Sequence, residues 1–411
     1  MAVAANRRVL YASQTGMTEP LGRAQVVPYL VGLSRAGWQI EVVSSEPEGT
    51  PAAAVADVRT LLGDHGIGYQ SFTRRLTHDW PTKLRESAQA LLHLVARALA
   101  RRPRLVHARS SLAATVAHLA ARLVPRARML FDCRGLVAEE YVDFGHWRRN
   151  TARYHLLTAA EHHLFRRADG IVVLTDRVRD YLRGEARLVG ERTLVEVIPC
   201  CVDLARFRFD ERARHAERAA LGAGDRFVLA YSGSLGACYS EAEMAKLYAA
   251  VRARRPSLFA VFTRSSPERL RTALRALGIP DEELRVRPAA PVEMPALLAA
   301  ADAAVSFIEP AFSKIASSPT KLAEYLAIGL PVAVNRGIGD QDRLMAAAAG
   351  TLVDAGERDD AGIAAAGAAL VAAAAVPGQR AAAQELARAH FSLDDVGVAR
   401  YRDVYERMAA R

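Results

Sequence analysis

The feature of this sequence that most constrains its fold is a regular alternation of short apolar runs with amphipathic segments. In the first half, the runs predicted as strands are 7–13, 39–44, 67–72, 104–108, 128–132 and 170–175. The second half repeats this rhythm at 226–232, 258–263, 283–287, 302–307, 331–335 and 350–353. Strands that alternate with helices form parallel sheets covered on both faces. The sequence therefore predicts an α/β protein built from two Rossmann-like domains.

A boundary between the two domains is predicted near residue 200. There the segment IPCCVD is followed by the charged helical pattern DERARHAERAAL. The chain has 411 residues, of which 51% are hydrophobic, and this is enough to bury two cores of ordinary size. We expect an N-terminal domain over 1–200 and a C-terminal domain over 201–392.

The charge of the chain is concentrated in its first half. The formal net charge is +10, and residues 1–200 hold 28 Arg and Lys against 19 Asp and Glu, leaving 27 against 26 for the rest. Within this half, segment 84–104 has an apolar helical face, flanked by Lys83, Arg85, Arg97, Arg101, Arg102 and Arg104. Such a helix can bind an anionic membrane peripherally, or it can be a solvated face of an Arg-rich protein.

Other partners and locations are limited by composition. The basic residues are scattered without interleaved aromatic residues, so nucleic acid is not an expected partner. The four cysteines have no metal-binding spacing, and they are typical of thiols in a reducing compartment. We expect a cytoplasmic protein, with peripheral contact at the inner face of the plasma membrane, and no metal or cofactor.

Candidate binding residues follow the predicted strands, because ligands of open parallel sheets collect at the carboxyl ends of the strands. After the first strand, Gly16 and Gly22 bracket a loop that opens a helix. Such a loop can hold a phosphate through its N–H groups, or it can be a plain tight turn. It is not a GxGxxG motif, and no acidic residue after the second strand suits a ribose. A nicotinamide dinucleotide site is therefore disfavoured.

Two further strand ends in the first half carry candidate catalytic residues. His107 and Arg109 end a strand in VHARSS, and Arg134 follows the next strand in FDCRGLVAEE. An arginine beside carboxylates at a strand end can bind a phosphate or pair internally. A histidine at such a position can be catalytic or a hydrogen-bonded structural residue.

The segment SSPTKLAEYLAIGLPVAVN gives the strongest signal in the second half. Ser318 and Thr320 are expected to cap a helix whose N–H groups and Lys321 would bind phosphates, with Glu324 for paired ribose hydroxyls. This geometry suits a nucleotide diphosphate, although a well-capped αβ unit is the simpler alternative. The full set of predicted donor-binding residues comprises Gly16, Gly22, Ser234, Gly236, Arg264, Lys314, Ser318, Thr320, Lys321, Leu322 and Glu324.

With these motifs in place, the chain resembles the family-4 glycosyltransferases, which have the GT-B fold. The likeness covers nearly the whole chain through SQTGMTEPLGRAQVVPYLVGLSRAGWQIEVV, FDCRGLVAEE, ADGIVVLTDRV, VIPCCVDLARF, YSGSLG and SPTKLAEYLAIGLPVAV. The resemblance implies two Rossmann-like domains facing across a cleft, with a helix at 393–410 crossing back, so that 393–411 joins the N-terminal domain. It also implies that Glu324 binds the donor ribose.

The function implied by the resemblance is a retaining, metal-independent transfer of a hexosyl or N-acetylhexosaminyl group from a nucleotide-diphosphate sugar. The acceptor would be a glycan or a polyprenyl-diphosphate-linked glycan of a bacterial surface polysaccharide. Two family features are changed in this sequence. Position 316 is Ala316 instead of a glutamate, and Ser234-Leu235-Gly236 stands where many members have an arginine and a lysine. Phosphate neutralisation is therefore expected from Arg264, Lys314 or Lys321.

Two other functions are compatible with the same residues. A nucleotide-sugar epimerase would form product without any acceptor. A non-catalytic nucleotide- or membrane-binding protein would bind lipid or nucleotide without donor turnover.

Overall fold

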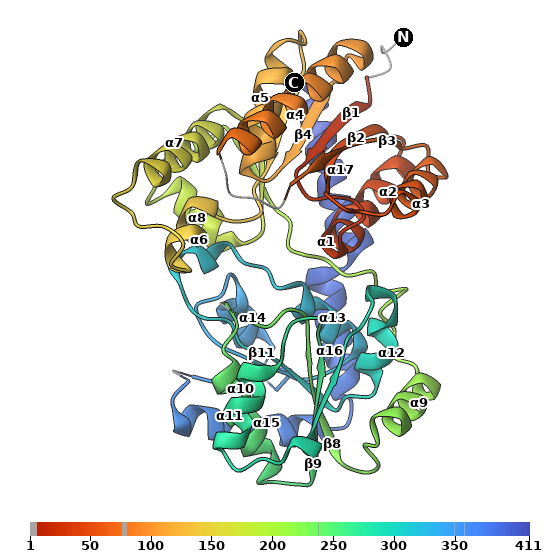
Figure 1. Ribbon diagram of the computed structural model, residues 1–411, viewed down its shortest axis with the longest axis vertical. Coiled ribbons are helices and arrows are strands. Elements are labelled where there is room, and N and C mark those ends of the chain that lie inside the picture. Colours follow the sequence, from red (N-terminus) through yellow and green to blue (C-terminus); the bar gives the residue numbers. More distant parts are fainter. Residues whose placement is uncertain (1–5, 76–79, 237, 349, 357) are drawn as a thin grey trace. The chain divides into compact units, whose positions relative to one another are not determined.

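The computed structural model describes residues 6–75, 80–236, 238–348, 350–356 and 358–411, and it shows two compact units. The first unit comprises Met1–Pro199 together with Leu393–Arg411, and the second comprises Cys200–Ser392. The division after Pro199 lies one residue before the boundary expected from sequence. Figure 1 shows a parallel sheet with helices on both faces in each unit.

The N-terminal unit is built on a seven-stranded parallel sheet in the order β3-β2-β1-β4-β5-β6-β7. Its strands are β1 (Arg8–Ser13), β2 (Gln39–Pro47), β3 (Gly68–Arg74), β4 (Leu105–Arg109), β5 (Arg128–Asp132), β6 (Gly170–Val173) and β7 (Leu194–Val197). All five residues of β4 are buried, as expected for a central strand covered on both faces. The strand β7 was not predicted, because only four residues of the loop before IPCC join the sheet.

Among the described residues of this unit, ten helical segments surround the sheet. They are α1 (Pro20–Gln25), α2 (Val27–Arg35), α3 (Ala52–Gly63), α4 (Trp80–Arg101), α5 (Ser111–Arg122), α6 (Val137–Asp143), α7 (Ala152–Arg167), α8 (Asp176–Arg183), the π-helical segment η4 (Leu393–Val398) and α17 (Ala399–Ala410). The helices α1 and α2 are separated at Val26, which leaves the helical backbone conformation. The C-terminal helix packs against β4 and β7, and Arg104 donates two hydrogen bonds to the Ala409 carbonyl.

The C-terminal unit repeats the design with a six-stranded parallel sheet in the order β10-β9-β8-β11-β12-β13. Its strands are β8 (Phe227–Ser232), β9 (Ser257–Phe262), β10 (Leu284–Arg287), β11 (Ala303–Ser306), β12 (Val332–Val334) and β13 (Leu352–Asp354). Its helices are α9 (Glu211–Leu221), α10 (Glu241–Arg252), α11 (Glu268–Ala276), α12 (Met294–Ala299), α13 (Thr320–Ile328), α14 (Gln341–Ala347), α15 (Asp360–Ala374) and α16 (Gln379–Phe391). Short 3₁₀ turns lie at η1 (Asp281–Glu283), η2 (Pro291–Glu293) and η3 (Phe312–Ala316).

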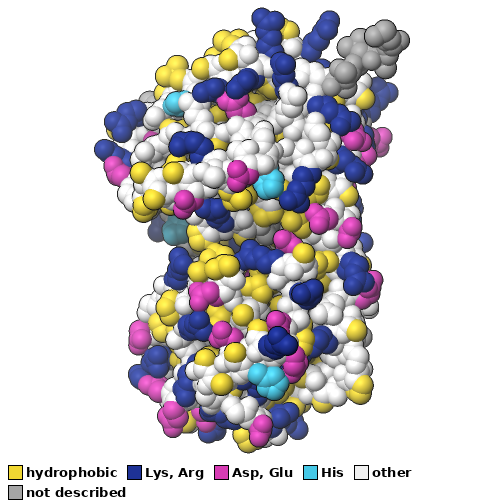
Figure 2. Space-filling model, turned by 90° about the vertical axis from the view of Figure 1, so that its right-hand side faces the viewer, with side chains coloured by type: hydrophobic (Ala, Val, Ile, Leu, Met, Phe, Trp, Pro, Cys, Tyr) yellow, Lys and Arg dark blue, Asp and Glu magenta, His cyan; other side chains and the backbone are white. Residues whose placement is uncertain are grey.

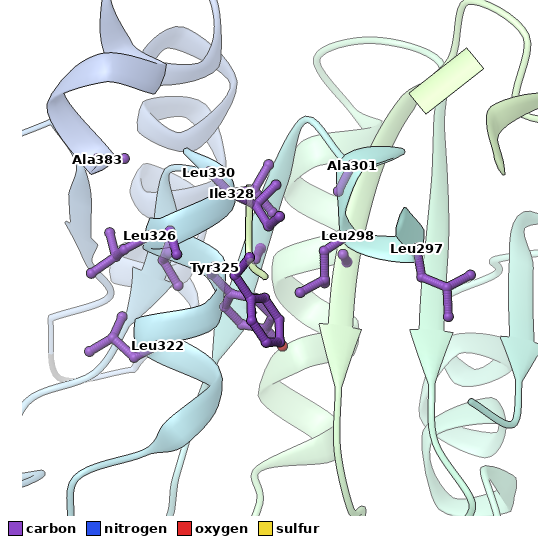
Figure 3. Packing of buried hydrophobic residues seen from close by; sticks show 14 of the residues in the cluster. Leu297, Leu298, Ala301, Leu322, Tyr325, Leu326, Ile328, Leu330 and Ala383 are labelled. Carbon is purple, nitrogen blue, oxygen red and sulfur yellow. The ribbon is translucent and has the colours of Figure 1, made fainter. Parts of the chain in front are cut away.

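One apolar face of α13 fixes this helix on the C-terminal sheet. Leu322, Tyr325 and Leu326 belong to a buried cluster shared with Leu297 and Leu298 of α12 (Figure 3). The Tyr325 hydroxyl also accepts a hydrogen bond from the backbone N–H of Ser232, at 2.7 Å. Because the core side of α13 is held this way, Lys321 of the same helix lies beside Tyr231, near the carboxyl end of β8.

No single helix among the described residues is long and apolar enough to cross a membrane. The helices α15 and α16 meet the length and composition criteria only as a pair, bent by 103° at their junction. The four cysteines, all within the described residues, form no disulfide.

Candidate active site

The candidate active site of the C-terminal unit lies where its strand order reverses. The strands β8 and β11 are neighbours, and the chain runs outward from them in opposite directions along the sheet. This is the switch point at which parallel sheets bind ligands. The loop after β8 and the helix α13, which follows β11 and η3, meet at this point, since a Cβ on Gly233 would lie 3.4 Å from the Lys321 Nζ.

Lys321 is held in a buried cage of two tyrosine rings. Its Nζ lies 4.0 Å from the ring centre of Tyr231 and 3.9 Å from that of Tyr239, and it donates a 2.8 Å hydrogen bond to the Tyr231 hydroxyl. The side chain is only 8% exposed. Burial lowers the pKa of Lys321 to about 7, although Cys238 and Glu324 act in the opposite direction. The two rings stabilise the ammonium by cation–π attraction. This attraction is weaker than the hydration that the ammonium loses on burial, so the pKa of Lys321 is still lowered.

Glu324 lies one turn further along the same side of α13 and is partly exposed. Burial raises its pKa to about 7, while the nearby Arg206 and Lys321 lower it. Among the described residues, no hydrogen bond or ion pair involves the Glu324 carboxylate. A carboxylate of this kind can accept two hydrogen bonds from a ligand, such as those of adjacent ribose hydroxyls.

Three other residues of this segment differ from their expected roles. Ser318 does not cap α13, whose N-cap position is Pro319, and its hydroxyl instead accepts a 3.1 Å hydrogen bond from the Cys200 N–H. Leu322 is buried in the core, its N–H donates to the Pro319 carbonyl, and its role in donor binding stays a prediction. Thr320 is the first residue of the helix, where N–H groups have no intrahelical acceptor.

The residues after β8 and β9 line the same edge. Ser234 is exposed, and its carbonyl accepts a hydrogen bond from the Tyr231 hydroxyl, so the caged lysine and the loop are linked. Gly236 has a φ of 122°, a conformation that favours glycine. The Ser265 hydroxyl accepts from the Leu235 N–H at 3.1 Å, which places the exposed Arg264 beside this loop.

Lys314 is placed differently from the other predicted cations. It lies in η3 and is buried, and its carbonyl accepts hydrogen bonds from Ser317 and Gly339. The structure therefore gives Lys321 direct contact with the β8 loop, and the role of Lys314 in donor binding stays a prediction.

The predicted phosphate loop of the N-terminal unit is occupied by the protein's own carboxylates. The N–H of Gly16 donates to Glu19 at 2.7 Å, and the N–H of Met17 donates to Glu46 at 2.6 Å. Thr18 and Tyr69 also donate to Glu46 through their hydroxyls. These N–H groups are not available to a phosphate in this structure, and the roles of Gly16 and Gly22 in donor binding stay predictions.

The two glycines of this loop are required by close packing. A Cβ on Gly16 would lie 2.3 Å from a carboxylate oxygen of Glu46, and one on Gly22 would lie 2.0 Å from the Gly16 carbonyl oxygen. Glu46 was missed by sequence reasoning because the second strand was expected to stop at 44, whereas β2 continues to Pro47. This acidic residue at the end of the second strand binds the loop itself.

The three predicted catalytic residues converge on one buried carboxylate, Asp132. Arg109 and Arg134 approach its two oxygens at 3.5 and 3.4 Å, and the Nε2 of His107 lies 3.5 Å from Oδ2. Asp132 is 0% exposed. Burial would raise its pKa, but the neighbouring Arg134, His107 and Arg109 together hold the pKa well below its usual range.

His107 has the contacts of a residue that joins the sheet to the C-terminal helix. Its Nδ1 lies 2.7 Å from the Tyr405 hydroxyl, and its ring packs against Tyr11 and Tyr401. Burial lowers the pKa of His107, so the ring is neutral at physiological pH. Catalytic roles for His107, Arg109 and Arg134 stay predictions, and the observed contacts give His107 and Arg109 positions away from solvent.

A cavity of about 50 Å³ opens between α4, α5 and the carboxyl ends of the first strands of the N-terminal unit. Its walls are mostly apolar, and include Val43, Phe72, Leu94 and Val116. Polar groups lie at Ser13, Gln14, Ser45, Arg74 and Glu86. The mixture of apolar walls and a few polar groups is typical of small-molecule sites, but such sites usually have volumes of roughly 300–1,000 Å³, far larger than this cavity.

Three residues of the C-terminal site were not predicted. Tyr231 and Tyr239 form the cage of Lys321, and Arg206 lowers the pKa of Glu324. Tyr231 has the sequence signature of an ordinary buried strand residue, and Arg206 is more than 100 positions from α13. No spacing rule connects them to Lys321, so only the tertiary structure could have found them. Among the described residues, no three His, Cys, Asp or Glu side chains could hold a metal ion together.

Comparison with known proteins finds likenesses in sequence and in fold. Residues 29–206 match Glycosyltransferase Family 4. The whole chain has the two-domain GT-B fold of solved glycosyltransferase structures. A sequence search of curated proteins gives no match.

The fold is shared with several solved proteins at low sequence identity. HepE from Anabaena, in complex with UDP, is 15% identical with a TM-score of 0.71, covering 98% of this chain and 100% of that chain. Sucrose-phosphate synthase from Thermosynechococcus elongatus is 16% identical, with a TM-score of 0.69 and coverage of 98% and 99%. WaaG, a glycosyltransferase involved in lipopolysaccharide biosynthesis, is 16% identical, with a TM-score of 0.66 and coverage of 98% and 99%.

Proposed function

We propose that this protein is a glycosyltransferase that binds a nucleotide-diphosphate sugar on its C-terminal unit. The observation that carries the proposal is the pair Lys321 and Glu324, on one side of α13 at the switch point of the sheet. One group can bind a diphosphate and the other a ribose. The solved HepE structures contain UDP, UDP with glucose, and UDP-glucose, which makes a UDP-sugar the first donor to test.

In this proposal the protein stabilises the departing nucleotide diphosphate. As the bond between the anomeric carbon and the phosphate oxygen breaks, negative charge grows on the diphosphate. The Lys321 ammonium and the first N–H groups of α13 are fixed before the reaction, so they stabilise that charge without reorganising. Lys321 thus takes the role of the arginine and lysine that Ser234-Leu235-Gly236 does not supply, and Arg264 is a second cation at this edge.

We further propose a retaining mechanism without a metal. The acceptor hydroxyl attacks from the face that the diphosphate leaves, the new glycosidic bond forms there, and the leaving phosphate oxygen takes the hydroxyl proton. The transferred group is a hexosyl or N-acetylhexosaminyl unit. Protein cations that can neutralise the diphosphate support metal independence, because they supply the charge that Mg²⁺ supplies elsewhere.

The acceptor is proposed to bind the N-terminal unit at the cavity between α4 and α5. Its polar groups at Ser13, Gln14 and Ser45 suit sugar hydroxyls, and its apolar walls suit a sugar face or a lipid portion. A glycan or polyprenyl-diphosphate-linked glycan of bacterial surface polysaccharide synthesis fits this chemistry. Such acceptors are made on the cytoplasmic side of the membrane, which is where we place the protein.

A thermal-shift panel tests the donor proposal directly. UDP, GDP, ADP and CMP, each free and as a nucleotide sugar, are compared, because a ligand at 100 times its Kd stabilises the folded state by about 2.7 kcal/mol. We expect one nucleotide to raise Tm in the wild type and, at the same concentration, to raise it about half as far in Glu324→Gln, whose binding is about tenfold weaker. If no nucleotide raises Tm, the donor proposal is wrong. Product formed from donor without acceptor would indicate the epimerase, and binding without turnover the non-catalytic protein.

A further inference from the structure

We propose that the outer face of α4 and α5 is a docking surface for an anionic lipid bilayer. This surface, called here the α4–α5 face, is defined by Leu92 and Leu99 of α4, Leu112 and Leu119 of α5, and Leu123 directly after α5. Arg85, Arg102, Arg122 and Arg126 lie at its ends. The proposal goes beyond the donor chemistry and does not depend on it.

The α4–α5 face holds a large share of the exposed apolar side chains of the protein. Eleven large apolar side chains are exposed among the described residues, and five of them are the leucines of this face. Leu92 is 71% exposed, and the exposed positions between Arg85 and Arg101 on α4 are otherwise Ala88, Gln89, Ala96 and Ala100. The helices α4 and α5, which carry four of these leucines, pack against each other. Exposed apolar patches of this kind mark interaction surfaces.

The exposed charged side chains on the same two helices are all positive. The only carboxylate on α4 or α5 is Glu86, which is buried and accepts a hydrogen bond from the Arg75 N–H. The exposed arginines Arg85, Arg102, Arg122 and Arg126 have no carboxylate partner among the described residues. Figure 2 shows hydrophobic and basic side chains next to one another at the upper end of the N-terminal unit. Leucines beside unpaired arginines match the hydrocarbon edge and the anionic headgroups of a bilayer.

The structure shows which basic side chains of segment 84–104 are engaged within the protein and are therefore not available to bind a membrane. Arg97 and Arg101 both pair with Glu41 of β2, at 3.2 and 2.7 Å. Arg104 donates to the carbonyls of Ala409 and Arg126, so it holds the C-terminal helix and does not face a membrane. The side chain of Lys83 lies outside the described residues. The expectation of one basic helix is thus replaced by a surface that two helices share.

Other occupants fit this face less well. A second copy on the same face would bring arginines against arginines, without carboxylates to pair with them. A nucleic acid would satisfy the arginines but would leave five leucines against a charged backbone. The fold also places α4 and α5 parallel to each other, since both run antiparallel to the strands around β4. Arg102, Arg122 and Arg126 therefore lie at the same end of the α4–α5 face, near the C-termini of the two helices. At this end they can contact lipid headgroups while the leucines contact the hydrocarbon.

Vesicle flotation with the full chain tests the proposal. The probes are vesicles of phosphatidylcholine alone and of phosphatidylcholine with phosphatidylglycerol. We expect the wild type to bind the anionic vesicles, to bind the neutral ones weakly, and to release as salt is raised. The double variant Leu92→Ser with Leu119→Ser should lower the bound fraction about tenfold or more. Arg102→Gln with Arg122→Gln should remove the preference for anionic lipid.

Matched controls come from the C-terminal unit. Leu277 is 45% exposed on the segment after α11, and Arg254 is exposed after α10. Leu277→Ser and Arg254→Gln should bind vesicles like the wild type, and unchanged Tm values should show that all variants fold. The proposal is overturned if the wild type does not float with anionic vesicles, or if the face variants float like the controls. A dimer that dissociates in Leu92→Ser with Leu119→Ser would also overturn it, because the face would then be a protein contact.

Discussion

Replacement of Lys321 by methionine should show whether nucleotide binding is coupled to protonation of this lysine. Burial lowers the pKa of this lysine from 10.5 to about 7. Since each pKa unit corresponds to about 1.4 kcal/mol, charging Lys321 in the unliganded protein costs roughly 5 kcal/mol more than charging a lysine in water. A bound diphosphate would supply the missing counter-charge, so its binding should draw a proton onto Lys321.

The direction of the pH effect follows from this pKa. At pH 6 and below, Lys321 is already almost fully protonated, so binding takes up almost no proton there. At pH 8 only about one tenth of the lysine is protonated when its pKa is about 7, so binding should take up about 0.9 proton. Over the same range, nucleotide affinity should fall about tenfold for each pH unit, until the pKa of the bound state is reached.

Isothermal titration calorimetry in buffers of different ionisation enthalpy measures this proton uptake. It is performed between pH 7.5 and 9, where the nucleotide phosphates no longer titrate. Lys321→Met should abolish the uptake and flatten the pH dependence. Lys246→Met is the matched control, because Lys246 is exposed and paired with Asp360, and should behave like the wild type. Tight nucleotide binding in the wild type without proton uptake at pH 8 would refute the reasoning.

Further outcomes are expected at other sites. Glu324→Gln should weaken nucleotide binding about tenfold at pH 8. It should also remove the loss of affinity below pH 7 that protonation of a carboxylate with a pKa of about 7 causes in the wild type, and affinities measured from pH 5.5 to 8 check this. Asp132→Asn should destabilise the protein by about 3–5 kcal/mol, since Arg109 and Arg134 lose a buried partner. In urea unfolding, this variant should lose less stability in acid, because the lowered pKa of Asp132 gives the wild type stability that disappears as pH falls. EDTA should leave sugar transfer unchanged, and activity lost to EDTA and restored by Mg²⁺ would contradict metal independence.

The sequence predicted the fold well because the signals for strands are local. Twelve of the thirteen strands lie where alternating apolar runs place them, and only the short strand β7 was missed. The two faces of α13 could also be predicted. With 3.6 residues per turn, Leu322, Tyr325 and Leu326 lie on one face of the helix, and Lys321 and Glu324 lie on another. Chain order alone could not show that Ser318 bonds Cys200 or that Leu322 is in the core.

The N-terminal site depends on contacts between residues that are far apart in the sequence, and local sequence patterns do not predict such contacts. His107 and Arg109 were chosen because they end a strand, and they do end β4. Their chemistry is decided by Asp132 on the next strand and by Tyr405, which is 298 positions away in sequence. The same is true of the loop at Gly16, where the N–H of Met17 is bound by Glu46, 29 positions away in sequence.

The sequence by itself thus determined the two parallel α/β units, the helix that carries Lys321 and Glu324, and the concentration of positive charge in the first half. Periodicity and composition are properties of neighbouring residues, and they need no knowledge of the packed chain. Only the tertiary structure decided which of these charges are available. Burial between Tyr231 and Tyr239 lowers the pKa of Lys321, and Glu41 neutralises Arg97 and Arg101. Desolvation and charge pairing depend on distances between remote segments, and these exist only after the chain has folded.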